Sequence, residues 1–184
     1  MSFQSWQETL ITATGDGPTL TAAATASCIP TSSVITLPNN FWQVGRMVRI
    51  FAAGRISCVI TTPGTARFDV RIAAVTAFDT GALNLNTVAK VTVPWWLDIV
   101  LTCRAIGSGT SANLMGVACF QSEAVVGAPL PAAGGNGVLL APVGAPAVGT
   151  GFDSTLANTL DMRFTQTVAT GSLTLHQYKV TSLN

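Results

Sequence analysis

Hydrophobic and polar residues alternate along much of the chain, with the two-residue period of strands that bury one face. Three segments show this most clearly, and their apolar sets are Phe68, Val70 and Ile72; Leu97, Ile99, Leu101 and Cys103; and Leu160, Met162 and Phe164. The residues between them include Arg67, Asp69 and Arg163, which we expect to face water. The pattern predicts antiparallel strands with an apolar inner face and an outer face that can hold ion pairs.

Gly, Pro and Asn residues bound these runs and divide the chain into short strands. The predicted strands are 8–13, 33–37, 46–59, 66–74, 83–93, 96–105, 113–122, 160–167 and 172–183. The strand at 83–93 is expected to end at Pro94, because proline cannot donate to a strand ladder. Helical periodicity is nearly absent, and strands do not alternate with helices. The prediction is therefore an all-β fold, an antiparallel double-sheet sandwich of jelly-roll type with about eight strands.

A length of 184 residues fits one domain. We expect an N-terminal segment or arm at 1–32 and a jelly-roll domain at 33–184, which includes a Gly/Pro/Ala-rich insertion at 124–151. Residues 125–151 hold seven Gly and four Pro, carry no charge and contain several large aliphatic residues. A flexible loop is one interpretation, but a solvated loop this apolar would invite aggregation. We favour an irregular arm that becomes ordered against a neighbouring subunit.

Composition excludes several classes of protein. Only 9% of residues are charged, against about 25% in an average domain, and the net charge is +1. The mean hydropathy of +0.48 excludes a disordered chain. Balanced charge leaves no basic footprint for nucleic acid, and no run of about 20 apolar residues could span a membrane. A surface with so few charges is expected to be covered by other chains.

Residues suited to catalysis are few: the chain has one His, one Tyr, two Lys and four Cys. No CxxC pair is present, and no acidic cluster has the spacing of a calcium site, so we expect neither metal nor cofactor. We expect no catalytic role for His176, and none for Asp153 and Asp161 as a facing carboxylate pair. We therefore predict that the chain is not an enzyme. The cysteines, which we expect to be buried free thiols in a reducing cytoplasm, are Cys28, Cys58, Cys103 and Cys119.

The adjacent tryptophans Trp95 and Trp96 allow two interpretations. They could form a platform on which a sugar ring stacks, or one could cap the core while the other packs at an interface. Our candidate interface residues are large apolar residues near the N-terminus, in the Trp pair or in the insertion: Phe3, Trp6, Trp95, Leu130, Val138, Leu139, Leu140 and Val143.

Three sequence groups occur in a recognisable order. Asn40-Phe41-Trp42 leads through Gly45-Arg46 into a strand, Pro94-Trp95 opens another strand, and Asp153-Ser154-Thr155 precedes the last two strands. Over about residues 35–183 this order resembles jelly-roll structural proteins of tailed double-stranded DNA bacteriophages, in particular capsid decoration (cement) proteins. The apolar insertion at 124–151 departs from that group.

The resemblance implies a virion protein on the capsid surface, made in the cytoplasm of a host bacterium. It also implies a homotrimer that binds the major capsid protein and stabilises the capsid without catalysis. The alternative is a tail-associated or lectin-like jelly-roll module that binds a host surface glycan through Trp95 or Trp96. Copy number per virion separates these two hypotheses.

Overall fold

The computed structural model of the protein describes residues 7–59, 63–125 and 138–184. Within these ranges it contains twelve β-strands and one short 3-10 helix. Their bounds are β1 (Glu8–Thr12), β2 (Thr25–Ser27), η1 (Thr31–Ser33), β3 (Ile35–Leu37), β4 (Met47–Cys58), β5 (Thr65–Ile72), β6 (Val75–Asp79), β7 (Leu83–Asn84), β8 (Lys90–Ala105), β9 (Asn113–Ser122), β10 (Val138–Ala141), β11 (Asn158–Gln166) and β12 (Ser172–Ser182). No helix in the described ranges is long and apolar enough to span a membrane.

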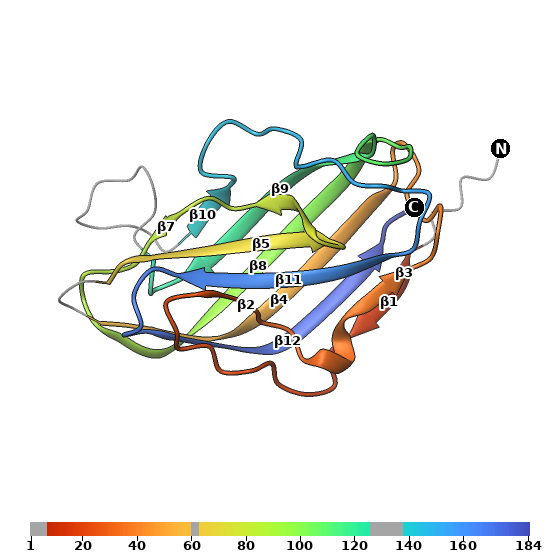
Figure 1. Ribbon diagram of the computed structural model, residues 1–184. Helices are drawn as coiled ribbons and strands as arrows, with labels where there is room; N and C mark the ends of the chain where they lie inside the picture. Colours follow the sequence, from red (N-terminus) through yellow and green to blue (C-terminus); the bar gives the residue numbers. More distant parts are fainter. Residues whose placement is uncertain (1–6, 60–62, 126–137) are drawn as a thin grey trace.

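The strands form two antiparallel six-stranded sheets. Sheet A has the order β1-β12-β4-β8-β9-β10. Sheet B has the order β2-β11-β5-β6, with β3 also pairing with β11 and β7 with β5. Sheet B lies across one face of sheet A, and the strands of the two layers cross (Figure 1). The predicted all-β double-sheet sandwich is therefore confirmed.

The core lies between the sheets and is centred on Phe68 of β5. Its ring centroid is 5.2 Å from that of Trp95, 5.3 Å from that of Phe120 and 5.2 Å from that of Phe164, so both sheets contribute to one aromatic cluster. All the residues that alternation assigns to inner faces on β5, β8 and β11 are buried. Alternation therefore predicts the faces of these three strands correctly.

Gly116 of β9 allows the two sheets to approach closely. A Cβ atom at this position would lie 2.8 Å from both Cγ and Cε2 of Phe78 on β6, and closer still to Cδ2. Carbon atoms in contact are normally about 3.5–4.0 Å apart, so only glycine leaves room for the ring. The Phe78 ring thus fills the space that a side chain on β9 would occupy.

The strand count exceeds the predicted number because β2, β6 and β10 lie outside every predicted strand; they have only three to five residues, too few to show a clear period. The predicted strand at 83–93 is divided in the structure, and its predicted end at Pro94 is wrong. Leu83–Asn84 forms β7, whereas Lys90–Val93 is the first part of β8, which runs on through Pro94. The ladder between β8 and β9 stops at Trp95 and Ser122, so Pro94 pairs only with Arg55 of β4. A strand with a partner on one side tolerates proline.

Both segments predicted to be arms contribute to the sandwich where they are described. β1 pairs with β12 and β2 with β11, which places residues 8–12 and 25–27 within the two sheets. In the insertion, β10 pairs with β9. Farther on, the amides of Val143 and Thr150 donate to the carbonyls of Thr80 and Thr76, at 2.9 and 3.1 Å. The described part of the insertion is thus bound to its own domain; residues 126–137 lie outside the described residues.

The sequence groups that carry the phage resemblance shape turns. Asn40 has a positive φ of 56°, and its amide donates to the Ser154 carbonyl at 3.0 Å. The Arg46 guanidinium lies 4.7 Å from the centroid of the Phe41 ring and donates to the Phe41 carbonyl at 2.6 Å. Asp153 accepts hydrogen bonds from the amides of Thr155 and Gly109, at 2.9 and 2.8 Å. These residues connect neighbouring loops.

The outer face of sheet B carries six charged side chains in three pairs: Arg67–Asp79, Arg71–Asp69 and Arg163–Asp161. Their register places Arg71 opposite Asp161 and Arg163 opposite Asp69, so opposite charges also meet across strands. Asp69 is only 4% exposed, which corrects the expectation that it faces water. Long arginine side chains on the same face cover its short carboxylate.

Candidate functional site

The outer face of sheet A is the candidate functional site, because it exposes aromatic and amide groups in one line. Residues directly opposite each other in antiparallel strands share a face. Gln177 of β12 lies opposite Ala53 of β4, Ala53 lies opposite Trp96 of β8, and Trp96 lies opposite Gln121 of β9. We call these four residues the platform row. In it, one tryptophan ring lies between two exposed amides, with a small alanine on one side.

Trp96 is held in a fixed orientation. Its indole N–H donates a hydrogen bond to Oε1 of Gln121. Phe51, on β4, presents a second half-buried ring whose centroid is 6.1 Å from that of Trp96 at an interplanar angle of 44°. The two rings form an apolar step on an otherwise polar part of the sheet.

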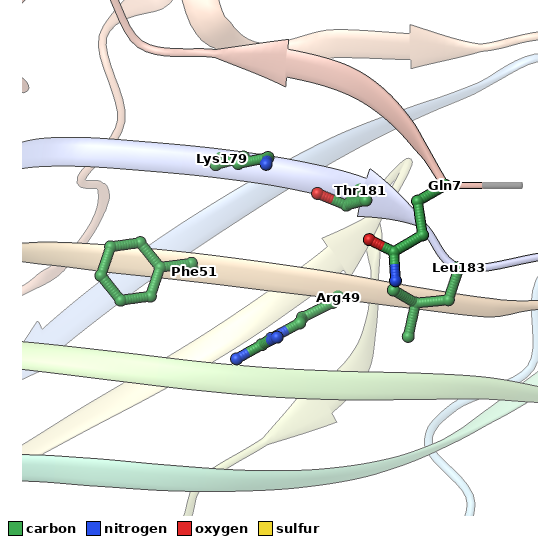
Figure 2. A pocket seen from close by; sticks show the side chains of 6 residues that line it. All are labelled: Gln7, Arg49, Phe51, Lys179, Thr181 and Leu183. Carbon is green, nitrogen blue, oxygen red and sulfur yellow. The ribbon is translucent and has the colours of Figure 1, made fainter.

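A shallow hollow of about 240 Å³ adjoins this step. Figure 2 shows Phe51 and Arg49 from β4 beside Lys179 and Thr181 from β12, with Gln7 and Leu183 at one end. The hollow is open to solvent and offers a ring, a hydroxyl, an amide and two cationic groups. Such a mixture of apolar wall and hydrogen-bonding groups is typical of ligand sites.

The two cations beside the hollow differ in their partners. Arg49 donates two hydrogen bonds to Asp98, Nε to Oδ1 at 2.8 Å and Nη2 to Oδ2 at 2.5 Å. These bonds, and the negative charge of Asp98, raise the pKa of the Arg49 guanidinium. Lys179 is exposed and makes no ion pair with any described residue. Arg49 is therefore a fixed donor, whereas the Lys179 ammonium can reach a ligand.

The residues weighed as catalytic candidates are engaged elsewhere. His176 Nδ1 lies 2.8 Å from Asp16 Oδ1 at a bulge of β12. Asp153 is bound to loop amides, and hydrogen bonds, first that from the Thr155 hydroxyl, lower the pKa of its carboxyl. Asp161 accepts from Ser27 at 2.6 Å, and burial raises the pKa of its carboxyl. Among the described residues no three His, Cys, Asp or Glu side chains gather as metal ligands would.

The predicted interface residues differ in how far they are buried. Trp95 is only 2% exposed and packs against Phe68 and Phe120, so the prediction that it forms an interface is wrong. Leu139 is buried on the inner face of β10, and its prediction fails for the same reason. Leu140 is 79% exposed on the outer face of sheet A.

Two further candidates are half-buried, Val138 on β10 and Val143 against the core. The remaining three, Phe3, Trp6 and Leu130, lie outside the described residues.

The alternation in the sequence indicates which of the two tryptophans faces the core. Leu97 and Ile99 face inward, and extending that alternation by one step places Trp95 inward and Trp96 outward. Phe51 could not be found in this way, because its relevance depends on β4 lying beside β8.

The described cysteines are all free. Three of them are buried as predicted, and burial raises the pKa of the thiols of Cys28 and Cys103. Cys119 differs, because it lies half-exposed on β9, where it faces outward opposite Asp98.

No protein-family model matches this sequence, and no curated protein matches it. Among solved structures, the chain is similar to the CBM2 module of the evolved Dit of Lactobacillus casei BL23 phage J-1. The likeness covers 99% of each chain, with 9% sequence identity and a TM-score of 0.35.

Proposed function

We propose that the chain is a non-enzymatic β-sandwich module that binds a carbohydrate on the outer face of sheet A. The observation that carries this proposal is the placement of Trp96 and Phe51 together on that face, with exposed amides at both ends of the platform row. It retains the glycan-binding alternative from the sequence, which named Trp95 or Trp96, and assigns it to Trp96, because Trp95 is buried.

The chemistry of a sugar ring fits this surface. A pyranose has an apolar face of C–H groups and an equatorial rim of hydroxyls. The apolar face would pack on the Trp96 ring, which the hydrogen bond to Gln121 holds in place. Rim hydroxyls would meet the amide of Gln177 and the ammonium of Lys179, both of which are exposed. Aromatic stacking combined with a few oriented polar groups supplies both affinity and orientation.

Binding to an array of purified bacterial surface polysaccharides tests the proposal. Trp96→Ala should weaken binding of the captured polysaccharide about tenfold, because an aromatic contact is worth about 0.5–1.5 kcal/mol and the ring is central. Phe51→Ala should weaken it less. Val91→Ala is the matched control, since Val91 is 73% exposed but lies outside the platform row. Unchanged binding by Trp96→Ala would refute the assignment of the face.

A second candidate function is structural: a virion protein that decorates the capsid surface as a homotrimer bound to the major capsid protein. The observation in its favour is that the chain has only 17 charged residues, nine basic and eight acidic, of which six pair with one another on sheet B. The other eleven charged residues are few for the rest of a chain of 184 residues. Hundreds of copies per purified virion would favour decoration, and a few tens at most would favour a tail module.

A further inference from the structure

The two sheets differ in how their charged side chains are balanced. The strands of sheet B carry three arginines and three aspartates, and these six residues pair with one another. The strands of sheet A carry five Lys and Arg residues but only two carboxylates: Arg49, Arg55, Lys90, Arg104 and Lys179 against Glu8 and Asp98. Sheet A therefore holds a surplus of positive charge, although the net charge of the whole chain is only +1.

Most of this surplus is free of ion pairs. Two of the five cations, Arg49 and Lys90, pair with carboxylates. The other three are exposed and pair with no carboxylate among the described residues: Arg55, Arg104 and Lys179. Unpaired cations on one face raise the local concentration of anions, so this face favours a negatively charged ligand.

Two of the unpaired cations lie on opposite sides of the platform row. Phe51, Ala53 and Arg55 occupy successive outward positions of β4, and Ala53 belongs to the row. Lys179 lies opposite Phe51, as Figure 2 shows, so it precedes the row by one outward position and Arg55 follows it by one. With about 3.4 Å per residue and about 4.8 Å between strands, the Cα of Arg55 lies about 8 Å from that of Trp96, and the Cα of Lys179 about 12 Å.

The two cations offer different kinds of contact to an anion. Arg55 donates from Nη1 to the Thr92 carbonyl at 2.8 Å, and its other N–H groups donate to no described residue. A guanidinium held in this way can bind two oxygens of one carboxylate or phosphate, whereas the Lys179 ammonium acts as a movable point charge. The carboxylate of Asp98, opposite Phe51, is bound by Arg49 and does not offset the two free cations.

We propose that the saccharide bound on the outer face of sheet A is anionic. Arg55 and Lys179 bind its carboxylate or phosphate groups while the apolar face of a sugar ring packs on Trp96, and Lys179 thus meets a charged group of the rim in place of a hydroxyl. This identification of the ligand class rests on the proposed function. Nucleic acid is disfavoured, because binding a strand takes a positively charged groove that follows the backbone, whereas here two separate cations flank one ring.

Binding to polysaccharides sorted by charge tests this. The array is divided into members with carboxylates, members with phosphates and uncharged members, and the sets include polygalacturonate, a phosphomannan and dextran respectively; a single-stranded DNA oligonucleotide is measured beside them. We expect binding to one or both anionic sets, which identifies the charged group. Lys179→Gln and Arg55→Gln should each weaken that binding about two- to fivefold at low salt, and the double variant about tenfold. Both side chains are exposed, so the variants should fold, and circular dichroism checks this.

Arg104→Gln is the matched control. It removes the same charge from the same sheet, and Arg104 is exposed and unpaired. It lies eight residues from Trp96 along β8, which is about 27 Å, so binding should be unchanged. Raising the salt from about 0.01 M to about 1 M shortens the screening length from about 30 Å to about 3 Å, and the difference between the wild type and the double variant should then disappear.

Binding to the uncharged set alone, or a double variant that binds as tightly as the wild type, would overturn the anionic ligand. Tighter binding to the oligonucleotide than to either anionic set would also overturn it. Trp96→Ala separates this failure from failure of the proposed function. If Trp96→Ala weakens binding and the double variant does not, the carbohydrate face stands and its ligand is not anionic. If Trp96→Ala leaves binding unchanged, or no polysaccharide binds, the face itself is refuted.

Discussion

Gly116 provides a sharp test of how the two sheets fit together. In Gly116→Ala the new Cβ would lie 2.8 Å from two atoms of the Phe78 ring and closer to a third. Normal carbon contacts are about 3.5–4.0 Å, so the ring must move by roughly 1 Å or more within a buried layer. Overpacking of this kind costs about 1–3 kcal/mol, and we expect a value near 3 because Phe78 is only 5% exposed. For a domain of this length the melting temperature should fall by roughly 6–12 °C.

The same structure predicts a rescue. Phe78→Leu removes the ring that the added methyl group meets, so the double variant Gly116→Ala/Phe78→Leu should be more stable than Gly116→Ala alone. The coupling free energy should be about 1–3 kcal/mol, measured by urea unfolding of the four proteins in the cycle. Gly144→Ala is the matched control, because its Cβ would meet no atom within 4 Å. Additive losses in the two single variants would refute the packing of β6 on β9.

Three further outcomes follow from the core and the carboxylates. Phe164→Ala, in the aromatic cluster, should lower the free energy of unfolding by about 3–5 kcal/mol, measured with urea. Arg67→Ala, in an exposed ion pair, should lower it by less than about 1 kcal/mol. Equal losses in the two variants would contradict the strand register. Burial raises the pKa of the Asp161 carboxyl above its value in the unfolded chain, because the buried carboxylate is poorly solvated. The folded protein therefore loses stability as the pH rises above the pKa of this carboxyl in the unfolded chain. Asp161→Asn should therefore have a higher melting temperature than the wild type at pH 7, and the two melting temperatures should converge near pH 3. Hydrogen bonds lower the pKa of the Asp153 carboxyl, so its stabilising effect should be present at pH 7 and lost on acidification, and Asp153→Ala should melt lower than the wild type only at the higher pH.

The sequence by itself determined the fold class and the faces of the long strands. An alternating strand must bury one set of side chains, and that constraint is local, so Phe68, Leu97 and Met162 could be assigned inward from the pattern alone. The same rule, carried one step further, would have placed Trp95 in the core and Trp96 outside. The strands β2, β6 and β10, of three to five residues, escaped prediction, because so short a run shows no clear period.

Only the tertiary structure decided which strands are neighbours, and the candidate site depends on that. Phe51 and Trp96 are 45 positions apart and meet because β4 pairs with β8. Asp69 lies at an outward position, yet arginine side chains from its own and the adjacent strand cover it. Alternation specifies only which side of a sheet a residue faces. What lies beside it on that side is set by strand order and register, which arise from packing between distant segments of the chain.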